Sequence, residues 1–153
     1  MTRVRHDPSG GDSGSGGPSR GAGEAVSFPL RRTDSSSFTG EAYSGLLADS
    51  APERPTRVYY VRFAPRARTH WHAHAGTQIL LVQEGTCLLQ QEGGPIERHP
   101  RGSVVRISPG KRHWHGAEPD HAMVHVALNL ESAHTDWLGS VSDTEYGGAG
   151  TST

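Results

Sequence analysis

Histidine is the residue type on which any chemistry in this sequence would depend. The chain of 153 residues contains ten histidines, and eight of them lie between positions 70 and 125. In His72-Ala73-His74, two imidazoles project from the same face of an extended strand, about 7 Å apart, because successive side chains point to opposite faces. Imidazoles at that separation can bind one first-row divalent metal ion. The pair predicts part of a metal site, since two ligands alone do not complete one.

Further metal-ligating side chains follow at two places along the chain. Gln78 comes four residues after His74, and its side-chain oxygen is a neutral, hard donor that suits manganese, iron, cobalt, nickel or zinc. Downstream, His113 and His115 follow a Pro-Gly turn in the segment PGKRHWHG. Spacing alone does not distinguish a metal site from histidines scattered over a surface. Both interpretations stay open at this point.

Short strand-like runs must position these side chains. The runs are separated by Gly or Pro turns, and none of them has a helical period. They cover residues 57–63, 70–74, 78–83, 86–91, 103–107 and 123–130. Their number and spacing predict an all-β sandwich or barrel.

Alternation along the strands predicts which side chains share a face. In MVHVALNL, Met123, His125 and Asn129 fall on one face, while the other face is entirely apolar. Such a strand fits a barrel that encloses a partly polar cavity, so these three residues are candidates for its lining. Tyr59 and Val61 are candidates by the same argument. Alternation alone leaves open that His125 points to solvent.

The composition predicts one folded domain between two tails. Residues 1–35, which begin MTRVRHDPSGGDSGSGGPSRGAGEA, offer almost nothing apolar to bury, so we expect a disordered tail. We expect the folded barrel over 36–146 and a flexible, Gly-rich end over 147–153.

Charge and cysteine content exclude several functional classes. A formal net charge of -1 and no basic block make nucleic-acid binding an unfavourable interpretation. No apolar run is long enough for a signal peptide or a membrane span, so we expect no membrane partner. Cys87 is the single cysteine, which rules out an internal disulfide framework and favours a reducing compartment. The expected location is the cytoplasm.

Two segments carry a resemblance to a known family. PRARTHWHAHAGTQILLVQEG resembles the first motif of the cupins, in which His-x-His is followed after three or four residues by a carboxylate and then by a glycine. The second cupin motif, Pro-x-Gly-x-x-His, resembles the segment PGKRHWHGAEPDHAMVHVAL, in which the proline stands one residue closer to the glycine than in the motif. The resemblance is strongest to small bacterial cupins that include manganese-dependent hydroxynitrile lyases. It implies a single-domain cupin, that is, a double-stranded β-helix or jelly-roll barrel.

The resemblance also implies roles for individual residues. It implies a metal site formed by His72, His74, Gln78 and His113. It implies that His115 and His125 line the cavity without binding the metal, and that they move protons, with His125 as the first candidate. The implied cofactor is one divalent transition metal, with manganese expected and iron, zinc, nickel or cobalt as alternatives. His70 departs from the subgroup pattern, and it is assigned either to the substrate pocket or to its rim.

Gln78 departs from the broader cupin pattern, which has a glutamate at this position. A neutral ligand set leaves the metal its full charge, which favours Lewis-acid chemistry on a small oxygenated organic molecule. We therefore expect a lyase that cleaves a C–C bond as hydroxynitrile lyases do, or a decarboxylase or isomerase that uses the same groups. A metal-dependent dioxygenase and a non-catalytic small-molecule-binding cupin are the alternatives. A homodimer or higher homo-oligomer is the family expectation.

Overall fold

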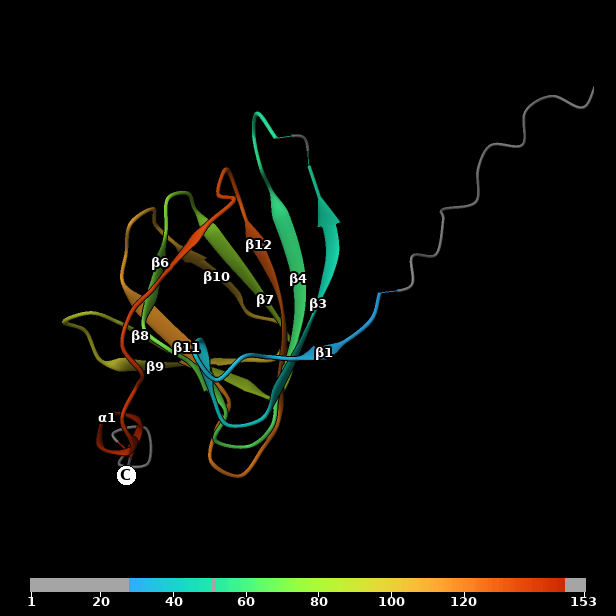
Figure 1. Ribbon diagram of the computed structural model, residues 1–153. Helices are drawn as coiled ribbons and strands as arrows, with labels where there is room; N and C mark the ends of the chain where they lie inside the picture. The colour runs from blue at the N-terminus through green and yellow to red at the C-terminus, as the bar shows by residue number, and fades with distance from the viewer. Residues whose placement is uncertain (1–27, 51, 148–153) are drawn as a thin grey trace, which may run out of the picture.

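The computed structural model describes residues 28–50 and 52–147, and nearly all regular structure in these ranges is β-strand (Figure 1). The first sheet has six strands in the order β1-β3-β4-β12-β7-β10. Their bounds are β1 Arg31–Arg32, β3 Ala42–Asp49, β4 Arg57–Phe63, β12 Met123–Asn129, β7 Gln78–Glu84 and β10 Val104–Ile107. The pairings along this sheet are antiparallel.

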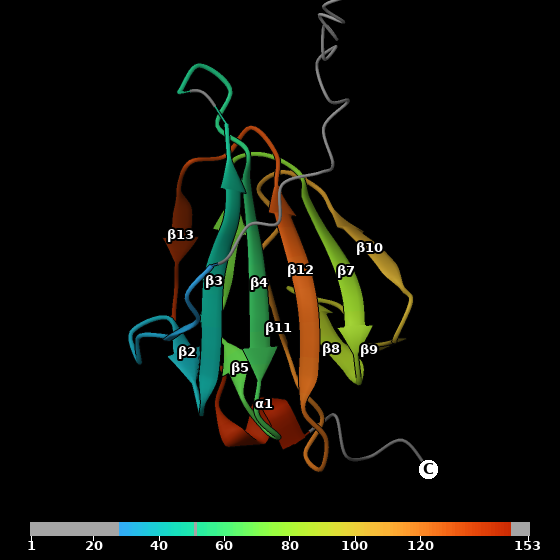
Figure 2. The ribbon, with the colours of Figure 1, turned by 90° about the vertical axis from the view of Figure 1, so that its right-hand side faces the viewer.

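The second sheet has seven strands and faces the first, so that the two curl into a barrel (Figures 1 and 2). Its path runs β13-β6-β11-β5-β2, with β8 paired to β11 and β9 paired to β8. The bounds are β13 Thr135–Trp137, β6 His72–His74, β11 His113–Gly116, β5 Arg68–Thr69, β2 Phe38–Thr39, β8 Thr86–Gln91 and β9 Ile96–Pro100. The predicted all-β barrel is confirmed.

Cross-strand register brings the polar side chains of the first sheet to one end of the barrel. Arg57 on β4 lies opposite Asn129 on β12, and Asn129 lies opposite Gln78 on β7. Residues that are directly opposite in an antiparallel pair point to the same face. Four residues earlier on β12, His125 lies opposite Val61 of β4. On the inner face, Arg57, Asn129 and Gln78 therefore form a polar row at one end of the barrel, and His125 lies deeper.

Beyond His125 the barrel interior is filled by apolar side chains. Met123 lies opposite Phe63, and both are fully buried in the main hydrophobic cluster. The same cluster contains Cys87, whose pKa burial raises to about 12, so the thiol is an inert packing residue. The tight turn between β7 and β8 requires Gly85, because its φ of 67° is positive and a Cβ there would meet the Ala122 carbonyl oxygen at 2.2 Å.

The N-terminal end of the described chain contains a strand that the sequence did not predict. Arg31–Arg32, inside the range predicted as a disordered tail, form β1 and pair with β3, so the folded part begins before residue 36. Backbone pairing at a sheet edge needs no apolar side chains, which explains why composition did not reveal it. Residues 1–27 and 148–153 of the two predicted tails lie outside the described residues.

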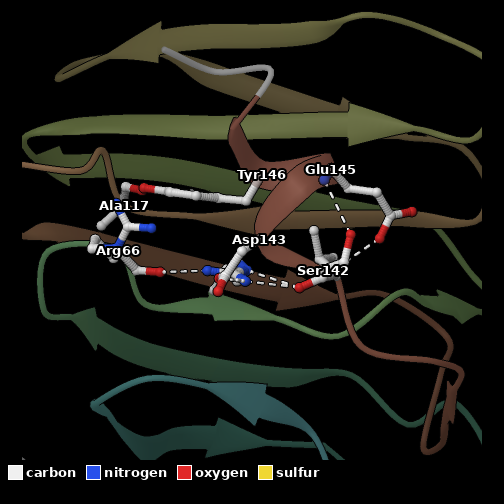
Figure 3. A network of polar contacts seen from close by, with 8 residues as sticks. Arg66, Ala117, Ser142, Asp143, Glu145 and Tyr146 are labelled. Atoms are coloured by element: carbon white, nitrogen blue, oxygen red, sulfur yellow. Dashed lines mark hydrogen bonds and ion pairs between the residues drawn. The ribbon is translucent and has the colours of Figure 1, made fainter.

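A single helical turn, α1 at Asp143–Gly147, lies against the lower end of the barrel (Figure 2). Figure 3 shows the polar network around it. The buried guanidinium of Arg68 donates to the Val141 carbonyl oxygen and to Asp143, while Tyr146 donates to the Ala117 carbonyl oxygen at 2.7 Å. This network fixes the segment around Val141–Tyr146 against the barrel. Within the described residues, no helix has the length and apolar character that crossing a membrane requires.

Candidate metal centre and cavity

Three buried histidines converge from adjacent strands. His72 and His74 project from β6, and His113 projects from β11 directly opposite His72. One ring nitrogen from each lies within 4.8 Å of the others. Alternation along β6 and antiparallel pairing with β11 are sufficient to produce this arrangement.

Backbone carbonyls orient two of these rings. His72 Nδ1 lies 2.8 Å from the carbonyl oxygen of His70, and His113 Nδ1 lies 2.8 Å from that of Lys111. A carbonyl oxygen only accepts, so each Nδ1 carries the hydrogen and donates. In the neutral ring, Nε2 then presents its lone pair. This is the tautomer in which histidine binds a metal through Nε2.

His74 is oriented by a side chain from a strand that lies far along the sequence. Its Nδ1 lies 3.2 Å from Thr135 Oγ1 on β13, and the ring of His72 packs against Trp137 with centroids 4.8 Å apart. The Nε2 atom of His74 is buried and has no hydrogen-bond partner among the described residues. An unpartnered buried nitrogen costs free energy, and a metal ion would satisfy it.

Burial keeps the three imidazoles neutral. Desolvation lowers the pKa of His74 and of His113 to about 4, and it lowers the pKa of His72 well below the ordinary value of 6.5. The neighbouring imidazoles lower the pKa of His72 further. Neutral imidazole is the form that ligates metals, so this cluster is prepared to do so at pH 7.

Gln78 completes the arrangement from the other sheet. Its Oε1 lies 2.9 Å from His113 Nε2, while its Nε2 donates to Asn129 Oδ1 at 2.9 Å. Gln78 Oε1 and His113 Nε2 both offer lone pairs, because Nδ1 of His113 holds the single proton of the neutral ring. Two ligands bound about 2.1 Å from one ion at neighbouring positions lie about 3 Å apart. These donors therefore fit a divalent cation.

A second histidine pair lies beside the cluster. His125 Nε2 and His115 Nδ1 are 3.1 Å apart, and both residues are buried. The His115 ring centroid lies 5.2 Å from that of His72, which places His115 between the cluster and His125. Desolvation lowers the pKa of His125 to about 4 and that of His115 well below 6.5.

One cavity of about 470 Å³ lies between the two sheets, and its lining includes His72, His74 and Gln78 but not His113. Three of the predicted pocket residues, Tyr59, Val61 and Asn129, line it, as do His115 and His125. Met123 does not, because it lies past His125 at the packed end of the barrel. His70 does not either, because the strand is interrupted before β6 and the alternation does not extend back to it. His70 contributes its carbonyl oxygen instead.

Several lining residues were not found from the sequence. They include Phe38, Arg57, Thr135 and Trp137. Arg57 could have been found, because it shares the alternation of Tyr59 and Val61. The β13 residues carry no such signal, since a strand of three residues shows no period.

Comparison with known proteins agrees with this geometry. The Cupin domain family model matches residues 59–128. A (R)-mandelonitrile lyase of Granulicella tundricola is 46% identical over 88 residues, which cover 56% of this chain and 67% of that protein. A cupin-like protein of Thermotoga maritima superposes with a TM-score of 0.72 at 40% identity, covering 77% of this chain and 91% of that one.

The chain belongs to the cupin family. More distant barrels share only the fold, such as the polyketide cyclase RemF of Streptomyces resistomycificus, with 19% identity and a TM-score of 0.55 over 69% of this chain and 76% of that one.

Proposed function

We propose that this chain is a metal-dependent lyase that acts on a small oxygenated organic molecule, with cyanohydrin cleavage among its activities. The observation that carries the proposal is the convergence of three imidazoles beside a buried histidine pair, at a cavity that both groups help to line. The similarity to a (R)-mandelonitrile lyase supports this reaction class.

We propose His72, His74, Gln78 and His113 as the residues that hold the ion. A divalent cation held by these neutral ligands would supply Lewis acidity, which polarises an oxygen and lowers the pKa of a hydroxyl. Manganese is the proposed ion. Asn129 fixes the Gln78 amide so that its oxygen points toward the histidines.

The histidine pair supplies proton transfer. In the cleavage of an α-hydroxynitrile, His115 takes the proton of the hydroxyl group, the C–C bond to the nitrile carbon breaks, and its electron pair leaves with cyanide. The carbonyl double bond forms, and the proton passes to the departing cyanide. His125 lies behind His115, where it can share the proton across their 3.1 Å contact.

The cavity wall suits an organic substrate. Phe38, Phe63 and Trp137 present aromatic surface, and the volume of about 470 Å³ accommodates a molecule the size of mandelonitrile. Enclosing the reaction in this wall limits the access of water to the reacting groups.

Elemental analysis of the protein as isolated, together with aldehyde release from mandelonitrile and oxygen consumption, tests the proposal. We expect about one transition-metal ion per chain, benzaldehyde release and no oxygen uptake. Oxygen uptake with bound iron would identify a dioxygenase, and ligand binding without turnover would identify a binding module.

Substitution of single ligands tests the proposed site. We expect His72→Ala or His113→Ala to lose the ion and keep the barrel, because the core is apolar and lies apart from the cluster. His121→Ala, at an exposed position, is the matched control. Full metal occupancy in both ligand variants would contradict the assignment.

We also propose a homodimer or higher homo-oligomer, which light scattering can measure.

A further inference from the structure

Among the described residues, Arg57 is the one arginine in the cavity lining. The side chain is half-buried, and the structure records no hydrogen bond or ion pair for it among residues 28–50 and 52–147. Asp49 lies directly opposite Arg57 on β3 but is exposed and makes no recorded ion pair with it. Arg57 is therefore a partly desolvated cation at the cavity that forms no ion pair within the described part of the chain.

Strand register directs Arg57 toward the candidate metal centre. Arg57, Asn129 and Gln78 occupy one row across β4, β12 and β7, with their side chains on the inner face. Neighbouring strands are about 4.8 Å apart, so the Arg57 backbone lies about 10 Å from that of Gln78. A guanidinium on a three-carbon stem spans much of that gap. A small molecule can contact both groups.

The lining residues favour an anion. No Asp or Glu belongs to the cavity lining in the described part of the chain. Asp136 on β13 lies outside this lining, with its carboxylate 3.1 Å from His134 Nε2. A bound divalent ion with neutral ligands would add further positive charge.

We propose that the substrate class of this site is a small organic carboxylate, whose carboxylate group is bound by Arg57. The planar guanidinium donates two parallel hydrogen bonds to a carboxylate, which a neutral ester, amide or nitrile does not match. The remainder of the molecule packs against Phe38, Tyr59 and Trp137. This inference rests on the proposed function, because it names the substrate class of the same cavity.

Calorimetric binding of mandelate and of its neutral isostere mandelamide to the metal-loaded protein tests the inference. We expect the wild type to prefer mandelate, and Arg57→Gln to weaken mandelate binding about tenfold or more while leaving mandelamide binding unchanged. Arg62→Gln is the matched control, because Arg62 lies on the same strand with its side chain exposed on the outer face. Unchanged mandelamide binding also shows that the Arg57 variant is folded.

Three results would overturn the inference. They are absence of mandelate binding to the wild type, equal affinity for the two compounds, and equal losses in Arg57→Gln and Arg62→Gln. Mandelonitrile cleavage measured on the same preparations separates the two proposals. If mandelonitrile is cleaved but mandelate and mandelamide bind equally well, only the proposal of a carboxylate substrate is contradicted. If mandelate binding depends on Arg57 but no lyase activity is found, only the proposed lyase function is contradicted.

Discussion

His115 Nδ1 and His125 Nε2 lie 3.1 Å apart inside the barrel, and the outer nitrogen of each ring, His115 Nε2 and His125 Nδ1, has no partner among the described residues. One ring donates across this contact and the other accepts. A neutral imidazole has one N–H and one lone pair, so the pair always leaves one N–H and one lone pair free, at opposite ends. Transfer of a proton along the pair exchanges the two ends.

We predict that His115→Ala reduces turnover by about 10²- to 10⁴-fold, the usual contribution of a positioned acid or base. The sequence favoured His125 for this role. The structure places His115 nearer the histidine cluster, so we expect His125→Ala to cause the smaller loss. Steady-state turnover and metal content of both variants provide the test. Loss of metal from His115→Ala would make this residue a ligand instead.

The pH dependence of turnover follows from the direction of the pKa shifts. Burial lowers the pKa of His125 to about 4 and that of His115 well below 6.5, so both remain neutral, and able to accept a proton, as the pH falls below 6.5. We predict that the acidic decline in kcat/KM lies below pH 6. A profile that falls with a midpoint at pH 6.5 would show that these imidazoles are not desolvated during catalysis.

Gln78→Glu tests the importance of neutral ligands. The variant adds a carboxylate beside His113 Nε2, where the wild-type amide oxygen lies at 2.9 Å. We predict retained or tighter metal binding with lower turnover, because the added negative charge reduces the Lewis acidity of the ion. Metal titration and turnover of the same preparation measure the two effects. Unchanged turnover in the metal-bound variant would remove the argument from ligand charge.

The C-terminal network provides a stability prediction that is independent of the site. Tyr146→Phe removes the donor that satisfies the Ala117 carbonyl oxygen (Figure 3), and we expect a loss of about 1–2 kcal/mol in the free energy of unfolding. Metal content should not change. Tyr43→Phe is the control, because its hydroxyl contacts Glu41 at an exposed position. Equal effects of the two substitutions in denaturant unfolding would show that the buried bond is not special.

The sequence predicted the fold and the histidine cluster because both depend on local patterns. His72 and His74 share a face by alternation, and the apolar runs between Gly and Pro turns are typical of a barrel. These patterns also placed Tyr59 and Val61 correctly on the cavity wall.

The unpredicted features depend on tertiary packing. Thr135 reaches His74 only because β13 crosses to pair with β6. Met123 obeys the alternation but lies where the barrel is filled, and a one-dimensional pattern does not indicate depth. The orienting oxygen of His70 belongs to the backbone, which every residue shares, so residue type carried no signal for it.

The rate of benzaldehyde release from mandelonitrile, before and after removal of metal, tests the central claim most directly. We predict that the protein as isolated cleaves mandelonitrile, that chelation abolishes the activity, and that added Mn²⁺ restores it in the wild type but not in His113→Ala. A rate that is unchanged by chelation, and equal in the His113 variant, would contradict the assignment of a metal-dependent lyase to this histidine cluster.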